Sequence, residues 1–167
     1  MNAVALIGFM GSGKSRVGML AAALLCVPFV DTDALIAEQL GPIEDIFAER
    51  GEAFFRSVEH DVCVTVLEKG IKLPGVVSLG GGAVMDEDVQ RALRRLSQVV
   101  WLTAPSDLLY ERATEGGRPL ARDRATFDAL LATREPLYRS LATAVVANDG
   151  GRSLDEVARE VAALAGA

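Results

Sequence analysis

The segment Gly8–Ser15 constrains the fold of this chain more than any other. Its letters, GFMGSGKS, match the pattern GxxxxGK[ST] at every fixed position. An apolar run at Ala3–Ile7 precedes the segment, and a helical pattern at Lys14–Leu25 follows it. This strand–loop–helix context is the one in which the pattern binds phosphate, whereas a chance glycine-rich turn would not need it. We therefore expect an α/β protein that binds a nucleoside triphosphate.

The residue types in this loop suit a phosphate ligand. Glycines let the backbone curl so that several N–H groups face one anion, and the next helix presents its positive end to the same anion. Lys14 is expected to reach the β- and γ-phosphates, and the Ser15 hydroxyl to bind Mg²⁺. The predicted nucleotide-binding residues of this segment are Gly11, Ser12, Gly13, Lys14, Ser15 and Arg16.

Short apolar runs alternate with amphipathic stretches along the whole chain. The runs are Ala3–Ile7, Pro28–Val30, Gly75–Leu79, Gln98–Leu102 and Ala144–Ala147. The predicted helices between and after them are Lys14–Leu25, Asp33–Leu40, Ile43–Lys69, Glu87–Leu96, Ser106–Thr114, Ala125–Ala142 and Ser153–Ala165. Uninterrupted apolar strands are typical of parallel sheets that are covered on both faces. The alternation therefore predicts a three-layer α/β/α sandwich made of one domain over residues 1–167.

Composition and charge exclude several classes of function. Half of the 167 residues are apolar, which predicts one domain with a sizeable core. The net charge of −6 argues against nucleic acid or an anionic membrane as a partner. Two cysteines and one histidine leave little material for a disulfide framework or a zinc site. Gly18 and Pro28 interrupt the apolar stretch 17–30, so we expect neither a membrane span nor a signal sequence, and a cytoplasmic location.

Two acidic residues at the end of the second apolar run indicate an acceptor site. Asp31 and Asp33 flank Thr32 and lie at the carboxyl edge of the predicted sheet, where ligands bind. One carboxylate can hold hydrated Mg²⁺ while the other takes a proton from an acceptor hydroxyl. The alternative is that both serve as caps for the following helix.

Three further segments carry candidate binding residues. Arg56 and Glu59 can pair on one helix face, which by itself is more often a solvated ion pair than a site. Gly80–Gly82 follow a buried strand and would let a ligand lie against the backbone. Glu115–Arg124 contain two glycines, a proline and three arginines without periodicity. That segment predicts a mobile lid at about 115–124, with a plain surface loop as the alternative.

In this order, the motifs resemble those of the shikimate kinase family over nearly the whole chain. The resemblance rests on GFMGSGKS, the DTD at 31–33, FAERGEAFFRSVE at 47–59, the triple glycine, RPL at 118–120 and REPLY at 134–138. It implies a five-stranded parallel sheet in the order 2-3-1-4-5, with a substrate-binding helical region at about 32–60. It also implies transfer of phosphate from ATP, with Mg²⁺, to the 3-hydroxyl of shikimate, on the route to chorismate and the aromatic amino acids. We expect a monomer that acts on this small molecule.

The resemblance also assigns roles to individual residues. Asp33 is the implied base, and the implied catalytic residues are Asp33, Lys14 and Arg118. Metal binding falls to Ser15 and Asp31. Shikimate is implied to contact Asp33, Arg56, Gly80, Gly81, Gly82 and Arg134, with the arginines holding its carboxylate. Arg112 is placed beside the adenine, and Arg118 on the lid reaches the ATP phosphates.

Two other functions remain open from the sequence. One is a related kinase for another polyol acid, such as gluconate, or for a nucleoside monophosphate. The other is a nucleotide-binding domain without activity, although such a domain would be expected to lose Lys14, Asp33 or Arg118, and all three are present. Arg16 occupies a position where the family usually has Thr, and a cation in a first helical turn opposes the helix dipole.

Overall fold

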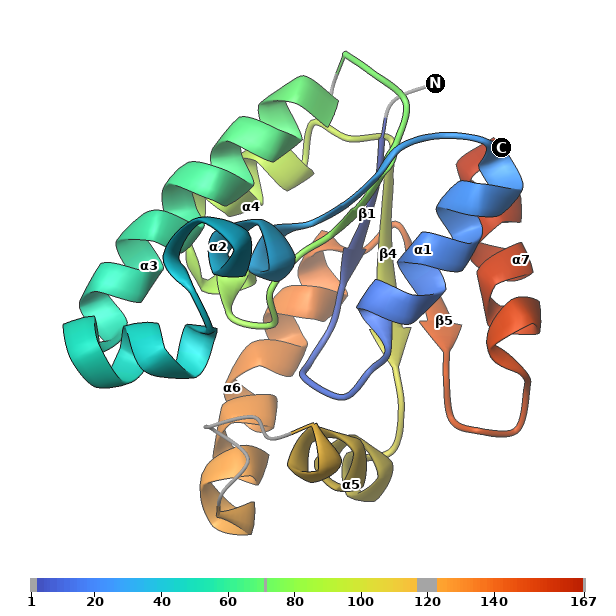
Figure 1. Cartoon of the computed structure of the whole chain (residues 1–167). Helices are drawn as coiled ribbons and strands as arrows, with labels where there is room; N and C mark the ends of the chain where they lie inside the picture. Colours follow the sequence, from blue (N-terminus) through green and yellow to red (C-terminus); the bar gives the residue numbers. More distant parts are fainter. Residues whose placement is uncertain (1–2, 71, 117–122, 167) are drawn as a thin grey trace.

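A parallel sheet of five strands forms the centre of the molecule (Figure 1). The structure is a computed structural model, and it describes residues 3–70, 72–116 and 123–166. The sheet order is β2-β3-β1-β4-β5, and every neighbouring pair is parallel. The strands are β1 (Val4–Ile7), β2 (Phe29–Asp31), β3 (Val76–Ser78), β4 (Gln98–Thr103) and β5 (Ala144–Ala147). The predicted strand order and direction are confirmed.

Helices cover both faces of this sheet, so the predicted three layers are also confirmed. Two of them, α1 and α7, pack against each other on one face, while α3, α4 and α6 lie over the other (Figure 1). The helices are α1 (Lys14–Leu25), α2 (Thr32–Leu40), α3 (Ile43–Gly70), α4 (Glu87–Leu93), α5 (Ser106–Glu115), α6 (Arg124–Leu141) and α7 (Leu154–Gly166). In the part of the chain that the structure describes, no helix is long and apolar enough to cross a membrane.

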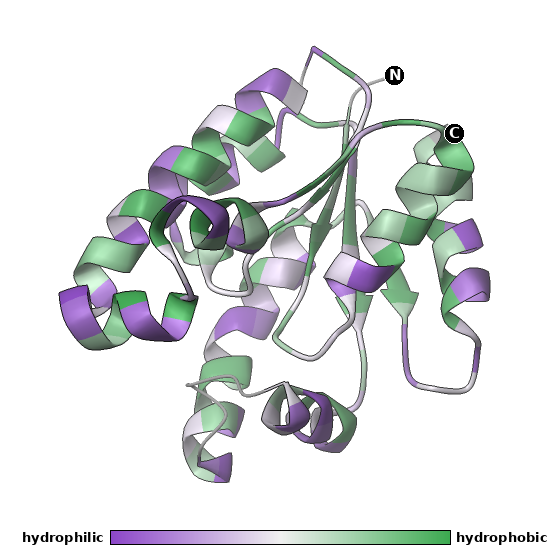
Figure 2. Ribbon diagram, viewed as in Figure 1, coloured by the Kyte–Doolittle hydropathy of each residue, from purple (hydrophilic) through white to green (hydrophobic). Residues whose placement is uncertain are grey.

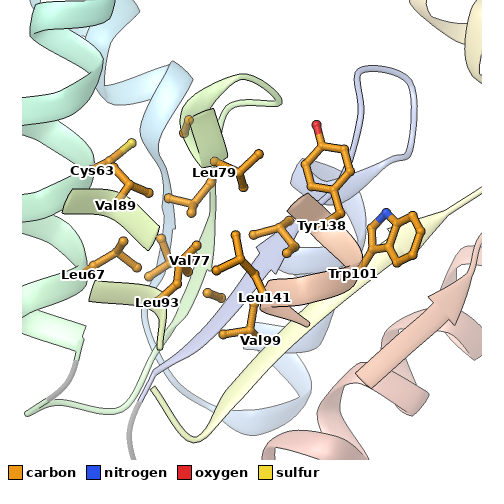
Figure 3. Packing of buried hydrophobic residues seen from close by; sticks show 14 of the residues in the cluster. Cys63, Leu67, Val77, Leu79, Val89, Leu93, Val99, Trp101, Tyr138 and Leu141 are labelled. Atoms are coloured by element: carbon orange, nitrogen blue, oxygen red, sulfur yellow. The ribbon is translucent and has the colours of Figure 1, made fainter. Parts of the chain in front are cut away.

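The alternation of side chains along β1 explains why its sequence is apolar without interruption. Val4 and Leu6 belong to the core beneath α1 and α7, whereas Ala5 and Ile7 belong to the core beneath α3, α4 and α6. Successive strand residues point to opposite faces, so a strand between two helical layers must be apolar at every position. Figure 2 shows apolar strands at the centre, with hydrophilic residues along the helices. Figure 3 shows the core beneath α3, α4 and α6 at close range.

A third, smaller core supports the region that was expected to bind substrate. It contains Ile36 from α2 and both Ile46 and Phe55 from α3. Gly51, with φ of 82° and ψ of 169°, interrupts α3, where the sequence predicted one continuous helix. The first part of α3 therefore turns back over α2, and the small core lies apart from the two cores on the sheet.

The structure differs from the prediction at two other places. A short 3₁₀ helix, η1 (Ala83–Met85), follows the three glycines and was not predicted. Helix α4 ends at Leu93, although the apolar pattern continued to Leu96. Both differences concern single turns, whose ends depend on capping and neighbouring contacts more than on periodicity. Of the predicted lid at about 115–124, residues 117–122 lie outside the described residues.

Candidate functional site

Two adjoining cavities open at the carboxyl ends of the strands. The larger, called here the long cleft, has a volume of about 580 Å³ and runs from Asp31 past the glycine-rich loop to Arg152. The smaller, called here the acid pocket, has about 80 Å³ and is lined by α2, α3, α6 and the glycines after β3. The residues that line both cavities are Met10, Asp33 and Gly81. A group bound in one cavity can therefore meet a group bound in the other beside Asp33.

The loop between β1 and α1 forms one wall of the long cleft. Gly11 and Gly13 have φ values of 82° and 87°, in the left-handed region that favours glycine. A Cβ at Gly11 would lie 2.4 Å from the Leu109 carbonyl oxygen, and one at Gly13 would lie 2.5 Å from Asn148 Nδ2. The loop can therefore hold this curl only with glycine at both positions, and α1 begins directly after it, at Lys14.

Lys14 is buried within the loop that it follows. Its Nζ donates to the Phe9 carbonyl at 3.1 Å and to Ser12 Oγ at 3.4 Å. The ammonium group therefore lies in the concave side of the loop, beside the first helical N–H groups of α1. This is the position from which a lysine in such a loop reaches phosphate oxygens.

Ser15 and Asp31, the two predicted metal ligands, meet across the cleft. The Ser15 hydroxyl donates to Asp31 Oδ2, and Asp31 Oδ1 accepts the Ala34 N–H at 3.1 Å. Asp31 is thus also the N-cap of α2. The alternative that this residue caps the following helix is therefore correct for Asp31, which lines the cleft as well. A hydroxyl and a carboxylate are oxygen ligands of the kind that Mg²⁺ prefers, so this pair fits the ion.

Asp33 lies in the first turn of α2, where its carboxylate faces the glycines after β3. Thr32, the residue before it, is buried and accepts the Gly80 N–H on its hydroxyl at 3.1 Å. This bond joins the end of β2 to the end of β3, although the two residues are 48 positions apart. It keeps Gly80 against Asp33, whose Oδ1 would lie 2.6 Å from a Cβ at position 80.

The acid pocket is lined by two arginines and by the carboxylates of Asp33 and Glu59. Arg56 Nη1 donates to Glu59 Oε2 at 2.5 Å, and Glu59 is only 4% exposed. Burial raises the pKa of Glu59, and the Arg56 guanidinium opposes that shift. The pair is therefore not the solvated surface pair that the sequence left as an alternative, because it lies inside the pocket.

Arg134 provides the second guanidinium of this pocket. It is 5% exposed and lies over the Phe9 ring, with Cζ 5.4 Å from the ring centre. Burial lowers the pKa of Arg134, the neighbouring Tyr138 acts in the opposite direction, and repulsion by Arg56 adds to the lowering. Arginine stays protonated at neutral pH all the same, so both guanidiniums keep their charge and present N–H donors of the kind that bind a carboxylate.

Residues after β5 close the far end of the long cleft. Arg112 Nη1 donates to the Asn148 carbonyl at 2.8 Å, and Asn148 Nδ2 donates to the Ser12 carbonyl at 2.9 Å. Asn148 is buried and holds the glycine-rich loop in place. Its role could not be derived from a motif, since the only signal in the sequence is its position directly after the last strand.

The structure brings most of the predicted site residues together. The residues that line one or both cavities are Gly11, Gly13, Lys14, Ser15, Arg16, Asp31, Asp33, Arg56, Gly80, Gly81, Gly82, Arg112 and Arg134. Ser12 belongs to the glycine-rich loop and is fully buried, and Arg118 lies outside the described residues. The sequence did not reveal the burial of Glu59 or the contacts of Thr32 and Asn148, because each depends on a partner far along the chain.

Comparisons with known proteins agree with this geometry. The family model described as "Shikimate kinase" matches residues 10–165. Shikimate kinase from Moorella thermoacetica is 41% identical over 95% of this chain and 91% of its own, and the Salinispora tropica protein is 42% identical over 95% of both chains. The solved structure of shikimate kinase from Acinetobacter baumannii in complex with shikimate has a TM-score of 0.87 and 30% identity, and the match covers 96% of this chain and 90% of that one. The chain therefore belongs to the shikimate kinase family.

Proposed function

We propose that the protein transfers the γ-phosphate of ATP to the 3-hydroxyl of shikimate, giving shikimate 3-phosphate and ADP. The observation that carries the proposal is that the long cleft and the acid pocket adjoin at Asp33. One cavity has the loop and the helix end that suit a triphosphate, and the other has two guanidiniums that suit a small carboxylic acid. Family membership and the shikimate-bound relative support the same substrates.

The long cleft accounts for the ATP side of the reaction. Backbone N–H groups of the loop, the end of α1 and Lys14 bind the phosphates. Ser15 and Asp31 would hold Mg²⁺, which neutralises charge on the β- and γ-phosphates when it is bound. Arg112 lies at the end of the cleft where the adenine is expected, and Arg16 lies on the wall of the same cleft. We also assign Arg118, by its match to the family motif, to the ATP phosphates.

The acid pocket accounts for the acceptor side. Arg56 and Arg134 bind the carboxylate of shikimate, and Gly80–Gly82 let the ring lie against the backbone. The acceptor hydroxyl then lies beside Asp33. As its oxygen bonds to the γ-phosphorus, the bond from that phosphorus to the bridging oxygen breaks, and the hydroxyl proton passes to the Asp33 carboxylate. Placement and charge stabilisation are the main work of the protein in this reaction.

The first experiment measures ADP release with Mg·ATP alone and with shikimate, gluconate or AMP as acceptor. We expect turnover that depends on shikimate. Turnover on gluconate or AMP instead would contradict the proposed substrate, and ATP binding without turnover on any acceptor would favour a nucleotide-binding domain without activity. We expect Asp33→Asn to abolish transfer while ATP still binds, and substantial residual turnover in this variant would remove Asp33 from the role of base.

Three broader expectations accompany the proposal. The reaction would supply shikimate 3-phosphate on the route to chorismate and the aromatic amino acids. The protein is proposed to act as a monomer in the cytoplasm, without nucleic acid or membrane as a partner. The net charge of −6 supports the last point, since binding to phosphate-rich surfaces usually requires a basic excess.

A further inference from the structure

Tyr138 joins the hydrophobic core to the glycines of the acid pocket. Its ring is fully buried and stacks on Trp101, with ring centres 6.0 Å apart. Figure 3 shows the ring packed beside Trp101, with the hydroxyl pointing out of the cluster. That hydroxyl donates to the Gly81 carbonyl at 2.5 Å, across 57 positions of sequence.

This hydrogen bond sets the orientation of the peptide between Gly81 and Gly82. The carbonyl and the N–H of a trans peptide point in opposite directions, and the described residues contain no cis peptide. With its carbonyl on Tyr138, the peptide directs the Gly82 N–H away from α6. Neither the Gly81 nor the Gly82 N–H donates to a protein acceptor within residues 3–70, 72–116 and 123–166. Both glycines line the acid pocket, so these donors are available to a bound acid.

Tyr138 also lies one helical turn from the arginine of the acid pocket. Tyr138 follows Arg134 by one turn of α6, so the two side chains lie on one face. Tyr138 partly offsets the lowering of the Arg134 pKa by burial. Burial raises the pKa of Tyr138 itself, so the hydroxyl keeps its proton and remains a donor to Gly81.

We propose that Tyr138 is a positioning residue for shikimate: its hydroxyl holds the Gly81 carbonyl and so orients the Gly81–Gly82 peptide toward the acid. Tyr138 would not touch the substrate, because its side chain lies behind Gly81. This inference rests on the proposed function. It predicts that the hydroxyl affects the binding of shikimate and leaves the binding of ATP and the transfer step nearly unchanged.

The test compares Tyr138→Phe with the wild-type chain. Removing the hydroxyl is expected to raise KM for shikimate by about 2- to 13-fold, the range for losing one hydrogen bond. The kcat and the KM for ATP are expected to stay within about two-fold, because the variant retains every group assigned to the nucleotide and to proton transfer. Calorimetric titration with shikimate alone should show the same fold-change in Kd.

Two control variants separate positioning from general destabilisation. Tyr110→Phe removes the other tyrosine hydroxyl of the chain, which makes no hydrogen bond to another described residue. Val161→Ala removes buried methyl groups from α7, in the core on the opposite face of the sheet. Both controls are expected to keep the wild-type KM for shikimate. The emission maximum of Trp101, the single tryptophan, should match that of the wild type if the core around residue 138 stays packed.

The outcomes are distinct. If the wild-type chain is active, an unchanged KM for shikimate in Tyr138→Phe would overturn this inference alone. An equal rise in the KM values for shikimate and for ATP in that variant would do the same. So would a rise in KM for shikimate of the same size in Val161→Ala. A wild-type chain that does not phosphorylate shikimate would overturn the proposed function as well. If Tyr138→Phe does not fold, 3-fluorotyrosine in the Tyr110→Phe background changes the donor strength at position 138 only, and an unchanged KM for shikimate there would also overturn the inference.

Discussion

Alanine at each of the three successive glycines after β3 is expected to give a different result. A Cβ at Gly80 would lie 2.6 Å from Asp33 Oδ1 and 2.8 Å from Glu59 Oε1, whereas one at Gly82 would lie 2.5 Å from Arg56 Nη1. At Gly81 the nearest atom is a backbone nitrogen at 3.4 Å, which is ordinary contact. None of the three has a positive φ, so alanine suits the backbone at all of them. The results should therefore reflect which side chain must move.

The size of each effect follows from that side chain. In Gly82→Ala the long Arg56 side chain swings aside and loses its charge-assisted bonds to the acid, about 1.5–3 kcal/mol, or roughly 10- to 150-fold in KM for shikimate. Its flexibility should keep the change in unfolding free energy within about 1 kcal/mol. In Gly80→Ala the short Asp33 side chain must shift, and a 1 Å misplacement of a reacting group lowers kcat by about 100-fold. Crowding of the buried Glu59 adds about 1–3 kcal/mol of destabilisation.

The assay is an initial-rate measurement of ADP release in which shikimate and ATP are varied separately, with thermal unfolding of each variant beside it. Gly81→Ala serves as the matched comparison: its Cβ displaces no side chain, so its KM for shikimate should rise less than in Gly82→Ala and its kcat should fall less than in Gly80→Ala. The reasoning is refuted if Gly82→Ala retains the wild-type KM for shikimate, or if Gly80→Ala and Gly81→Ala have the same kcat. In the first case Arg56 does not hold the acid, and in the second Asp33 is not the group that Gly80 accommodates.

Three further predictions use other residues of the site. Arg134→Ala should mainly raise KM for shikimate, by about 10-fold or more from the loss of a charge-assisted contact; an unchanged KM in steady-state kinetics would show that the carboxylate is held elsewhere. Because burial raises the pKa of Glu59 above its usual 4.5, the stability that its protonated form contributes is complete below pH 4.5 and is lost as pH rises through the folded pKa. Glu59→Gln should therefore show a smaller fall in unfolding free energy from pH 4.5 to 7 than the wild type, and urea titrations with equal falls would contradict this. Arg16→Gln removes a cation from the first turn of α1, so the ligand-free Tm should rise by about 1–4 °C while ADP affinity falls; a lower Tm in calorimetry would count against the dipole argument.

Local patterns in the sequence were enough to predict most of the fold. The run Val4–Ile7 is apolar at every position because it lies between two helical layers. The uninterrupted apolar sequence of the strand therefore already indicates that both of its faces are covered. The break at Gly51 and the short helix Ala83–Met85 were not predicted. A single glycine is compatible with a helix at modest cost, and a three-residue turn is too short for a periodic pattern. Their conformations depend on the elements packed around them.

The chemistry of the site was also visible wherever it lay within one segment. The loop Gly8–Ser15 and the pair Asp31 and Asp33 each place residues of types that suit phosphate binding or acid–base chemistry within a few positions. These segments indicated which kinds of chemical group the protein is suited to bind. They did not determine which groups meet one another.

Only the tertiary structure decided which of these groups contact one another. Ser15 bonds to Asp31 across 16 positions, Thr32 to Gly80 across 48, and Tyr138 to Gly81 across 57. The tertiary structure also buries Glu59, whose helical pattern alone is equally compatible with a position in solvent and a position in a pocket. The physical reason is that backbone periodicity and turn geometry act over a few residues, whereas contacts between elements require the strand order and the packing of helices on both faces of the sheet.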